Sequence, residues 1–267
     1  MKPQTAIHYT DNYLINPTNP ITVNLIGAGG TGSNMLMALA KMNHSLIALG
    51  HSGLQLNLFD DDRVTTANQG RQLFADAELG LPKAVALINR TNRFFGTNWK
   101  AVTEQFSTTN LKSLPNQGKA NIFISCVDNA SARFDIANAL EKFTEHNNWE
   151  RNKSLYWLDI GNAQHTGQVI LSTIGNIQHP HSKLYKTVSN LPYVTDEFRE
   201  LLQSQEDKNQ PSCSLAEALE KQDLFINSTL ANMGASLLWK LFRDGMTQHR
   251  GFFLNLSEFR SQPILVG

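Results

Sequence analysis

The sequence predicts an α/β fold: a doubly wound, mostly parallel β-sheet with helices on both faces. Short apolar runs alternate along the chain with helical patterns, and this alternation favours parallel strands joined by crossover helices. The first unit, residues 21–40, reads as a strand, a glycine turn and a helix. In that order, backbone N–H groups and a helix N-terminus can face a phosphate. We therefore expect a bound nucleotide.

The composition is that of a globular chain without a global charge. The 267 residues are 41% hydrophobic and 17% charged, and 23 Lys and Arg balance 23 Asp and Glu. Because no overall basic field would attract nucleic acid, none is expected as a partner. No apolar run reaches the roughly 18 residues that span a bilayer, so no membrane contact is expected. Two cysteines and the lack of an apolar leader predict a cytoplasmic protein.

The predicted elements follow one another in a simple order. A polar N-terminal arm (residues 1–20) precedes a nucleotide-binding core (21–175), and a polar crossover segment (176–212) leads to a C-terminal part (213–267) that completes the same domain. Residues 43–55 are expected to be a loop insertion or a broken helix. Further strands are expected at 54–58, 99–106, 121–127, 155–160 and 167–171, helices at 84–95, 130–140 and 215–241, and an edge strand at 251–256.

The glycine turn alone is a weak functional signal. Gly27, Gly29 and Gly32 match G-x-G-x-x-G, which is also the fingerprint of dinucleotide-binding dehydrogenases. Gly30 adds a fourth glycine, which we interpret as allowing a closer backbone approach than a pyrophosphate alone requires. The acid after the second strand, Asp60, lies further along than the roughly 20 residues of the dehydrogenase pattern.

The residues beyond that acid favour a triphosphate over a dinucleotide. A hydride-transfer enzyme has no use for amides and cations packed just past its ribose-binding acid. Arginine gives forked hydrogen bonds to phosphate oxygens, lysine gives a point charge, and amides orient them. The residues that predict a triphosphate site are Asp60, Asp62, Asn68, Arg71, Gln72 and Lys83. The alternative is a solvated loop with incidental charges.

Four motifs together carry a family resemblance. GAGGTGS, DDDRVTTANQGRQ, GLPK and CVDNASAR occur in this order, and the chain resembles the ThiF/MoeB family, the bacterial relatives of ubiquitin-activating enzymes. The resemblance covers residues 21–171 well and 213–259 loosely. Within the family the chain is most similar to the ThiF-related protein of ParB-related, ThiF-related cassettes on bacterial mobile elements. The implied fold is Rossmann-like.

The resemblance implies a role for each matching residue. Asp60 would bind ribose with Asp62 beside it, and Asp128 would coordinate Mg²⁺ with Asn129 beside it. The other interpretation of Asp128 is a helix N-cap. Cations and Mg²⁺ would neutralise charge as a carboxylate attacks the α-phosphate. Gly27, Gly29, Gly30 and Gly32 would line ATP, while Asn68, Arg71, Gln72 and Lys83 would hold the phosphates and the leaving pyrophosphate.

Cys213 is the candidate nucleophile. The stretch P-S-C-S-L resembles the P-x-C-T-I stretch in which activating enzymes place the cysteine that receives an adenylated C-terminus as a thioester. If Cys213 opens the following helix, the helix dipole would favour its thiolate. The alternative is a small buried thiol. Cys126 sits in an apolar strand and is expected in the core.

The sequence also departs from the family pattern. Many members carry two C-x-x-C pairs that hold a structural zinc; this chain has neither, so no zinc is expected. The N-terminal arginine that reaches into the partner subunit's ATP site has no match, since residues 1–20 contain no arginine.

The leading functional hypothesis is therefore an ATP-dependent enzyme with Mg²⁺. It would adenylate the C-terminal carboxylate of a small ubiquitin-like or sulfur-carrier protein with a glycine tail. In this hypothesis, transfer of the adenylated tail to Cys213 as a thioester would follow. A homodimer is expected from the resemblance. Three alternatives stay open: adenylation of another carboxylate or of a tRNA base without a thioester, a nicotinamide-dependent dehydrogenase, and a non-catalytic nucleotide-binding scaffold of the cassette.

Overall fold

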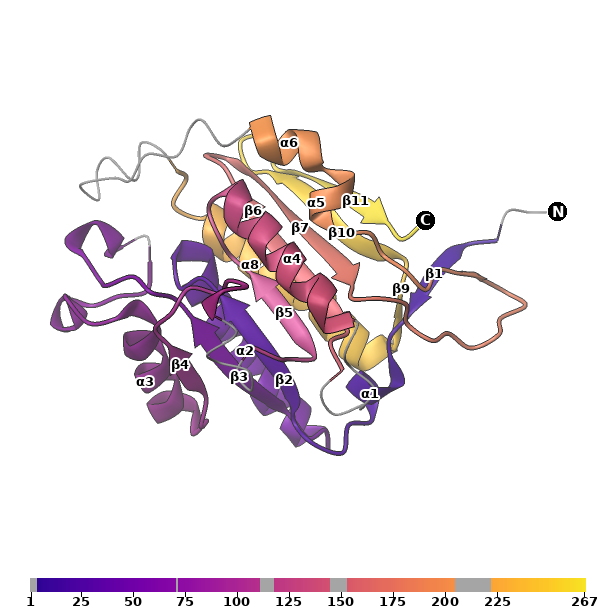
Figure 1. Cartoon of the computed structure of the whole chain (residues 1–267), viewed down its shortest axis with the longest axis horizontal. Coiled ribbons are helices and arrows are strands. Elements are labelled where there is room, and N and C mark those ends of the chain that lie inside the picture. Colours follow the sequence, from indigo (N-terminus) through magenta and orange to yellow (C-terminus); the bar gives the residue numbers. More distant parts are fainter. Residues whose placement is uncertain (1–3, 71, 111–117, 145–152, 205–221) are drawn as a thin grey trace.

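The computed structural model describes residues 4–70, 72–110, 118–144, 153–204 and 222–267 (Figure 1). The strands are β1 (Ala6–Tyr9), β2 (Ile21–Ile26), β3 (Leu54–Phe59), β4 (Lys100–Val102), β5 (Ile122–Ser125), β6 (Tyr156–Asn162), β7 (Thr166–Thr173), β8 (Lys186–Thr187), β9 (Met246–Thr247), β10 (His249–Asn255) and β11 (Arg260–Leu265). The helices are α1 (Asn12–Ile15), α2 (Gly30–Ala48), α3 (Lys83–Phe95), α4 (Ala130–Thr144), α5 (Val194–Glu197), α6 (Arg199–Ser204) and α8 (Ile226–Asp244), with short 3₁₀ turns η1 (Thr66–Asn68) and η2 (Asp76–Glu78).

An eight-stranded sheet organises the molecule. Its strand order is β11-β10-β7-β6-β5-β2-β3-β4. The neighbours from β6 to β4 are parallel, whereas β7, β10 and β11 are joined by antiparallel pairings. The predicted mostly parallel, doubly wound sheet is thus confirmed. Because the chain leaves β2 for β3 on one side and later returns to β5 on the other, β2 lies at a topological switch point.

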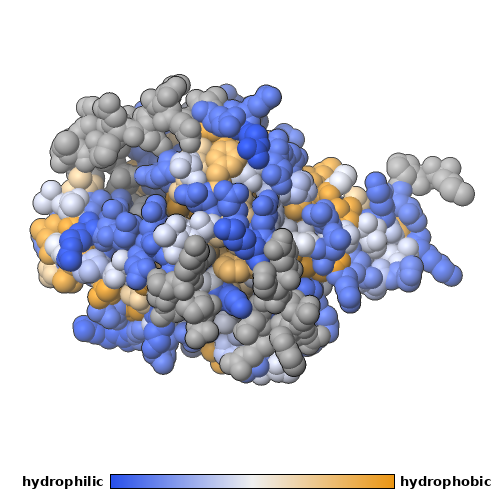
Figure 2. Space-filling model, in the orientation of Figure 1, coloured by the Kyte–Doolittle hydropathy of each residue, from blue (hydrophilic) through white to orange (hydrophobic). Residues whose placement is uncertain are grey.

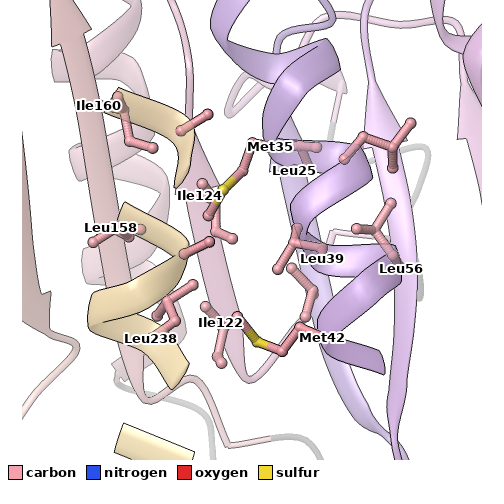
Figure 3. Close-up of a cluster of buried hydrophobic side chains, with 14 of the residues drawn as sticks. Leu25, Met35, Leu39, Met42, Leu56, Ile122, Ile124, Leu158, Ile160 and Leu238 are labelled. Atoms are coloured by element: carbon pink, nitrogen blue, oxygen red, sulfur yellow. The ribbon is translucent and has the colours of Figure 1, made fainter. Parts of the chain in front are cut away.

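Successive side chains of the central strands enter two different cores, one on each face. Leu25, Ile124 and Leu158 pack with α2, α3 and α8, while their neighbours in sequence, such as Ile26 and Phe123, pack with α4, α5 and α6. Figure 3 shows the first core, in which Met35, Leu39 and Met42 of α2 and Leu238 of α8 lie against the strands. Burial on both faces explains why these strands read as continuous apolar runs.

Residues 43–55 correct one prediction. Instead of a loop insertion or a broken helix, α2 continues to Ala48 and a short turn then leads into β3. The Asn43 side chain accepts a hydrogen bond from the N–H of Leu54 at 2.7 Å and so joins α2 to the start of β3. The turn itself uses glycine at positive φ, 83° at Gly50 and 79° at Gly53.

The predicted edge strand at 251–256 is also corrected. β10 is an interior strand, paired with β7 on one side and β11 on the other. β11 forms the edge, and the sequence pattern missed it because most of its residues are exposed and it contains Pro263. The helix predicted at 215–241 begins, within the described residues, only at Ile226, while residues 215–221 lie outside them.

The N-terminal arm and the crossover segment meet in a second, three-stranded sheet. β1 pairs with β8 in parallel and with β9 in antiparallel orientation. The described part of the crossover, 176–204, therefore contains a strand and two short helices. The face in Figure 2 is covered largely by hydrophilic residues. Among the described residues, no helix is both long and apolar enough to cross a membrane.

Candidate functional site

A pocket of 460 Å³ lies where four parallel strands end. The glycine turn follows β2, the acids follow β3, Asp128 follows β5, and Asn162 closes β6. Open α/β sheets bind ligands at the carboxyl ends of their strands beside a switch point. Most of the predicted binding residues meet here although they are far apart in sequence. Those that line the pocket are Gly27, Gly29, Gly30, Asp60, Asp62, Gln72, Lys83, Asp128 and Asn129.

The three glycines of G-x-G-x-x-G have different structural roles. Gly27 has a φ of 97°, and a Cβ there would lie 2.7 Å from the carbonyl oxygen of Cys126. A Cβ on Gly32 would lie 1.9 Å from the carbonyl oxygen of Gly27, so this glycine lets α2 pack against the turn rather than line the pocket. A Cβ on Gly29 would meet no atom within 4 Å and would enter open space. Of the glycines in this motif, Gly29 is the one whose Cβ position is open space.

The reason for the fourth glycine, Gly30, was missed by the sequence analysis. A Cβ on Gly30 would lie 2.6 Å from Nδ2 of Asn227, which is 2% exposed. Asn227 Oδ1 accepts hydrogen bonds from Thr31 Oγ1 at 2.7 Å and from Asn162 Nδ2 at 3.0 Å. Gly30 is thus required by a side chain of α8 rather than by a closer phosphate. Asn162 and Asn227 both line the pocket, and nothing local in the sequence indicates this.

Asp60 ties the glycine turn to the end of β3. Its Oδ2 accepts a hydrogen bond from the N–H of Ala28 at 2.6 Å, and its Oδ1 accepts one from the N–H of Asp62 at 3.1 Å. Burial raises the pKa of the Asp60 carboxyl to about 6, against the opposing effect of these N–H donors and of the Lys83 charge. A partly buried acceptor at this position is suited to a ribose hydroxyl.

The Lys83 ammonium is held at the pocket by Asp62. Lys83 Nζ lies 2.8 Å from Asp62 Oδ2, and the backbone N–H of Lys83 donates to the carbonyl of Asp62 at 2.9 Å. The lysine side chain is 8% exposed and the aspartate side chain 68%. An exposed carboxylate is stabilised by water as well as by its partner, so an anionic ligand can compete for the ammonium.

Gln72 and Asn68 have different surroundings. Gln72 is 6% exposed and lines the pocket, and its Oε1 is buried without a hydrogen-bond partner among the described residues. Such an atom indicates a place for a ligand or water. Asn68 does not line the pocket; its Oδ1 accepts hydrogen bonds from the backbone N–H and the hydroxyl of Thr65, at 2.8 and 3.0 Å, and caps η1.

Asp128 is exposed at the pocket and Asn129 caps the next helix. Asn129 Oδ1 accepts a hydrogen bond from the N–H of Ala132 at 2.7 Å, which is the N-cap contact of α4. The cap that was the alternative role of Asp128 therefore belongs to its neighbour. Within the described residues no group of three or more His, Cys, Asp or Glu side chains gathers. Mg²⁺ bound to a nucleotide needs only one or two carboxylates beside the phosphates, so Asp128 fits it.

Of the two cysteines, only Cys126 lies within the residues that the structure describes. Cys126 is partly buried at the pocket, and burial raises the pKa of its thiol, which disfavours the thiolate. Cys213, the candidate nucleophile, lies outside the described residues, as does Arg71.

Known proteins resemble this chain over much of its length. Ubiquitin-like modifier-activating enzyme 5 of Culex quinquefasciatus is 26% identical over 156 residues, and that of Drosophila willistoni is 30% identical over the same length. The match covers 54% of this chain and 34% of each relative, so the chain spans about a third of the relatives' length.

Solved structures share the fold. Escherichia coli MccB superimposes with a TM-score of 0.60 at 14% identity, over 95% of this chain and 63% of MccB. PaaA superimposes with a TM-score of 0.59 at 15% identity, over 92% of this chain and 64% of PaaA. The sequence profile of the ThiF family matches residues 18–264, nearly the whole chain. Its motifs at the pocket, its fold and this match agree: the chain belongs to the ThiF family.

Proposed function

We propose that the protein is an adenylyltransferase that activates a carboxylate with ATP. A carboxylate oxygen forms a bond to the α-phosphorus of ATP, the bond from that phosphorus to pyrophosphate breaks, and pyrophosphate leaves with the electron pair. The observation that carries the proposal is the pocket itself, which joins an open glycine backbone at Gly29, a partly buried acid at Asp60 and a buried ammonium at Lys83. These groups match phosphates and ribose.

In this proposal, residues of the chain bind and orient rather than react. The N–H groups of the glycine turn and the N-terminus of α2 face the phosphates, and Lys83 moves from Asp62 to the departing pyrophosphate. Gln72 supplies a buried amide to the bound nucleotide. Mg²⁺ held by Asp128, with Asn129 beside it, would neutralise phosphate charge.

The proposed substrate is the C-terminus of a small ubiquitin-like protein. The relatives named above are ubiquitin-like modifier-activating enzymes, which supports this choice. A second candidate is a peptide carboxylate, because structures of MccB with ATP and with MccA share this fold. Transfer to Cys213 and a homodimer are part of the first proposal.

The test is titration calorimetry of the full chain with ATP and Mg²⁺, alongside NAD⁺, in the wild type and in Asp128→Ala. We expect ATP to bind, NAD⁺ not to bind, and the variant to lose most of the Mg²⁺-dependent part of the affinity. Since Asp128 is exposed and Asn129 provides the cap of α4, the variant should fold normally.

The matched control is Asn129→Ala, which keeps the Asp128 carboxylate but removes the helix cap and the hydrogen bond from Asn129 Nδ2 to Asp128 Oδ1 at 3.2 Å. It should lower the free energy of unfolding by about 1 kcal/mol, the usual value of an N-cap, with a smaller loss of ATP affinity than Asp128→Ala. Binding of NAD⁺ without a response to ATP would overturn the proposal and restore the dehydrogenase hypothesis. Binding of ATP without exchange of radioactive pyrophosphate, in the presence of candidate tails, would favour the scaffold.

A further inference from the structure

One buried guanidinium holds the loop that carries Asp128. Arg133, in the first turn of α4, donates from Nη2 to the carbonyl of Val127 at 2.7 Å and from Nη1 to the carbonyl of Asn129 at 3.1 Å. These two carbonyls belong to the residues on either side of Asp128. The backbone before and after the exposed carboxylate is therefore fixed by a single side chain beneath it.

The charge of Arg133 is balanced inside the protein. Its Nε lies 3.0 and 3.1 Å from the two carboxylate oxygens of Asp159 in β6, and the two residues are 5% and 1% exposed. A buried charge is tolerated only when it is paired and hydrogen-bonded. Asp159 also accepts a hydrogen bond from Ser125 Oγ at 2.6 Å, and Ser125 accepts one from Trp157 Nε1 at 2.8 Å.

The surrounding backbone leaves room for this guanidinium. A Cβ on Gly161 would overlap Gln168 Nε2 and would also lie 2.7 Å from Arg133 Nη2, and the carbonyl of Ile160 accepts from the same nitrogen at 3.4 Å. The arginine thus reaches from α4 across the end of β5 to the end of β6. If Arg133 only joined α4 to β6 through its ion pair, its guanidinium would not need hydrogen bonds to the carbonyls on both sides of Asp128.

We propose that Arg133 is a positioning residue for Mg²⁺–nucleotide binding, with Asp159 orienting it. It holds the loop of residues 126–129 so that the Asp128 carboxylate faces the pocket. This inference rests on the function proposed above, because it assigns the metal to Asp128. Arg133 itself touches neither nucleotide nor metal and acts through the loop.

The test combines Arg133→Lys with two measurements. Lysine keeps the charge beside Asp159 but loses the forked hydrogen bonds to the two carbonyls. In hydrogen exchange, the amides of residues 126–130 should exchange faster while those of β2 and β5 stay protected. In calorimetry, the Mg²⁺ concentration needed for tight ATP binding should rise about 10- to 100-fold, the usual cost of losing a group that orients a metal ligand, with ATP affinity in EDTA unchanged.

One further variant separates positioning from general destabilisation. Trp157→Phe removes the hydrogen bond to Ser125 on the far side of Asp159, so it should lower the melting temperature and leave the Mg²⁺ requirement at the wild-type value.

The outcomes distinguish the two proposals. If the wild type binds no ATP, the proposed function fails, and hydrogen exchange of the loop still decides whether Arg133 holds it. If folded Arg133→Lys shows wild-type exchange at residues 126–130, the inference is wrong. It is equally wrong if ATP affinity falls to the same extent in EDTA and in Mg²⁺.

Discussion

Glycines that look alike in a motif have different physical causes in this protein. Gly27 is required because its φ is positive. Gly30 is required because a Cβ would overlap the side chain of Asn227, and Gly32 because a Cβ would overlap the carbonyl of Gly27. Gly29 alone has open space where its Cβ would be. A substitution at Gly29 therefore acts on the ligand, whereas a substitution at Gly32 acts on the fold.

Gly29→Ala should fold normally and bind ATP poorly. The φ of −73° suits alanine, so the melting temperature should stay unchanged or rise slightly. The new methyl group occupies the space that the phosphates need, and we expect ATP affinity to fall at least about tenfold, or about 1.4 kcal/mol. Calorimetry and thermal unfolding measure the two effects.

Gly32→Ala is the contrasting variant. Its methyl group would overlap the Gly27 carbonyl, so the turn or α2 must shift and the melting temperature should drop. Equal ATP affinity in Gly29→Ala and the wild type would contradict a phosphate site at this turn.

At the scale of elements, a buried histidine joins the N-terminal arm to the crossover. His8 of β1 contacts the carbonyl of Val188 through Nδ1 at 2.7 Å and the Tyr156 hydroxyl through Nε2 at 2.9 Å. The backbone N–H of Asp11 donates to that same hydroxyl. Because the Val188 carbonyl can only accept, Nδ1 carries the hydrogen of the neutral ring, so Nε2 accepts the hydrogen of the Tyr156 hydroxyl and every partner is satisfied. Protonation of Nε2 would place two hydrogens against each other.

This arrangement predicts a pH-dependent stability. Burial lowers the pKa of His8 to about 4, with the neighbouring His179 ring acting in the same direction. A lowered pKa in the folded state means that the unfolded chain takes up the proton first. The stabilisation is thus complete above pH 6.5 and is lost as the pH falls towards 4, by at most about 3 kcal/mol from 1.36 kcal/mol per pKa unit.

Comparison with His8→Gln measures this contribution. Urea unfolding between pH 7.5 and 4 should show a difference in unfolding free energy between wild type and variant that shrinks as the pH falls. Titrating groups that do not contact His8, such as Asp60 with its raised pKa, are common to both proteins and cancel. A difference that does not change with pH would contradict the assignment.

At the scale of the molecule, the sheet places the pocket between two cores. β2 is flanked by β3 and β5, so the glycine turn, the acids and Asp128 emerge at one edge. α8 closes the same edge through Asn227. The pocket is therefore built from residues of the first and last parts of the chain, and binding should depend on the whole fold.

The reaction of the whole protein gives the last prediction. In Cys213→Ala, ATP–pyrophosphate exchange with a protein or peptide ending in Gly-Gly should match that of the wild type, because adenylation needs no thiol. A conjugate that is cleaved by dithiothreitol should form with the wild type and be absent from the variant. If both proteins form the adenylate and neither forms the conjugate, the thioester step is wrong and adenylation stands.

The sequence was most informative where the signal is local. Apolar runs located β2, β5, β6 and β7, because strands buried on both faces show continuous hydrophobicity. The alternation of Leu54, Leu56 and Leu58 with polar residues located β3. The sequence was least informative for β11, which is exposed, and for the end of α2, where polar residues contact the next strand. The resemblance assigns Asn68 to the phosphates, and in the structure its side chain accepts a hydrogen bond from Thr65 at the start of η1 and does not line the pocket.

By itself the sequence determined the order of the elements, the doubly wound class and the family, because these depend on periodicity and on motifs short enough to read along the chain. Only the tertiary structure decided that Gly30 makes room for Asn227 and that Asn129 rather than Asp128 caps α4. It also decided that Arg133 donates hydrogen bonds to the backbone carbonyls on both sides of Asp128. Each of these is a packing or hydrogen-bond relation set in three dimensions, and the arrangement of backbone and side chains that creates it leaves no pattern in the sequence.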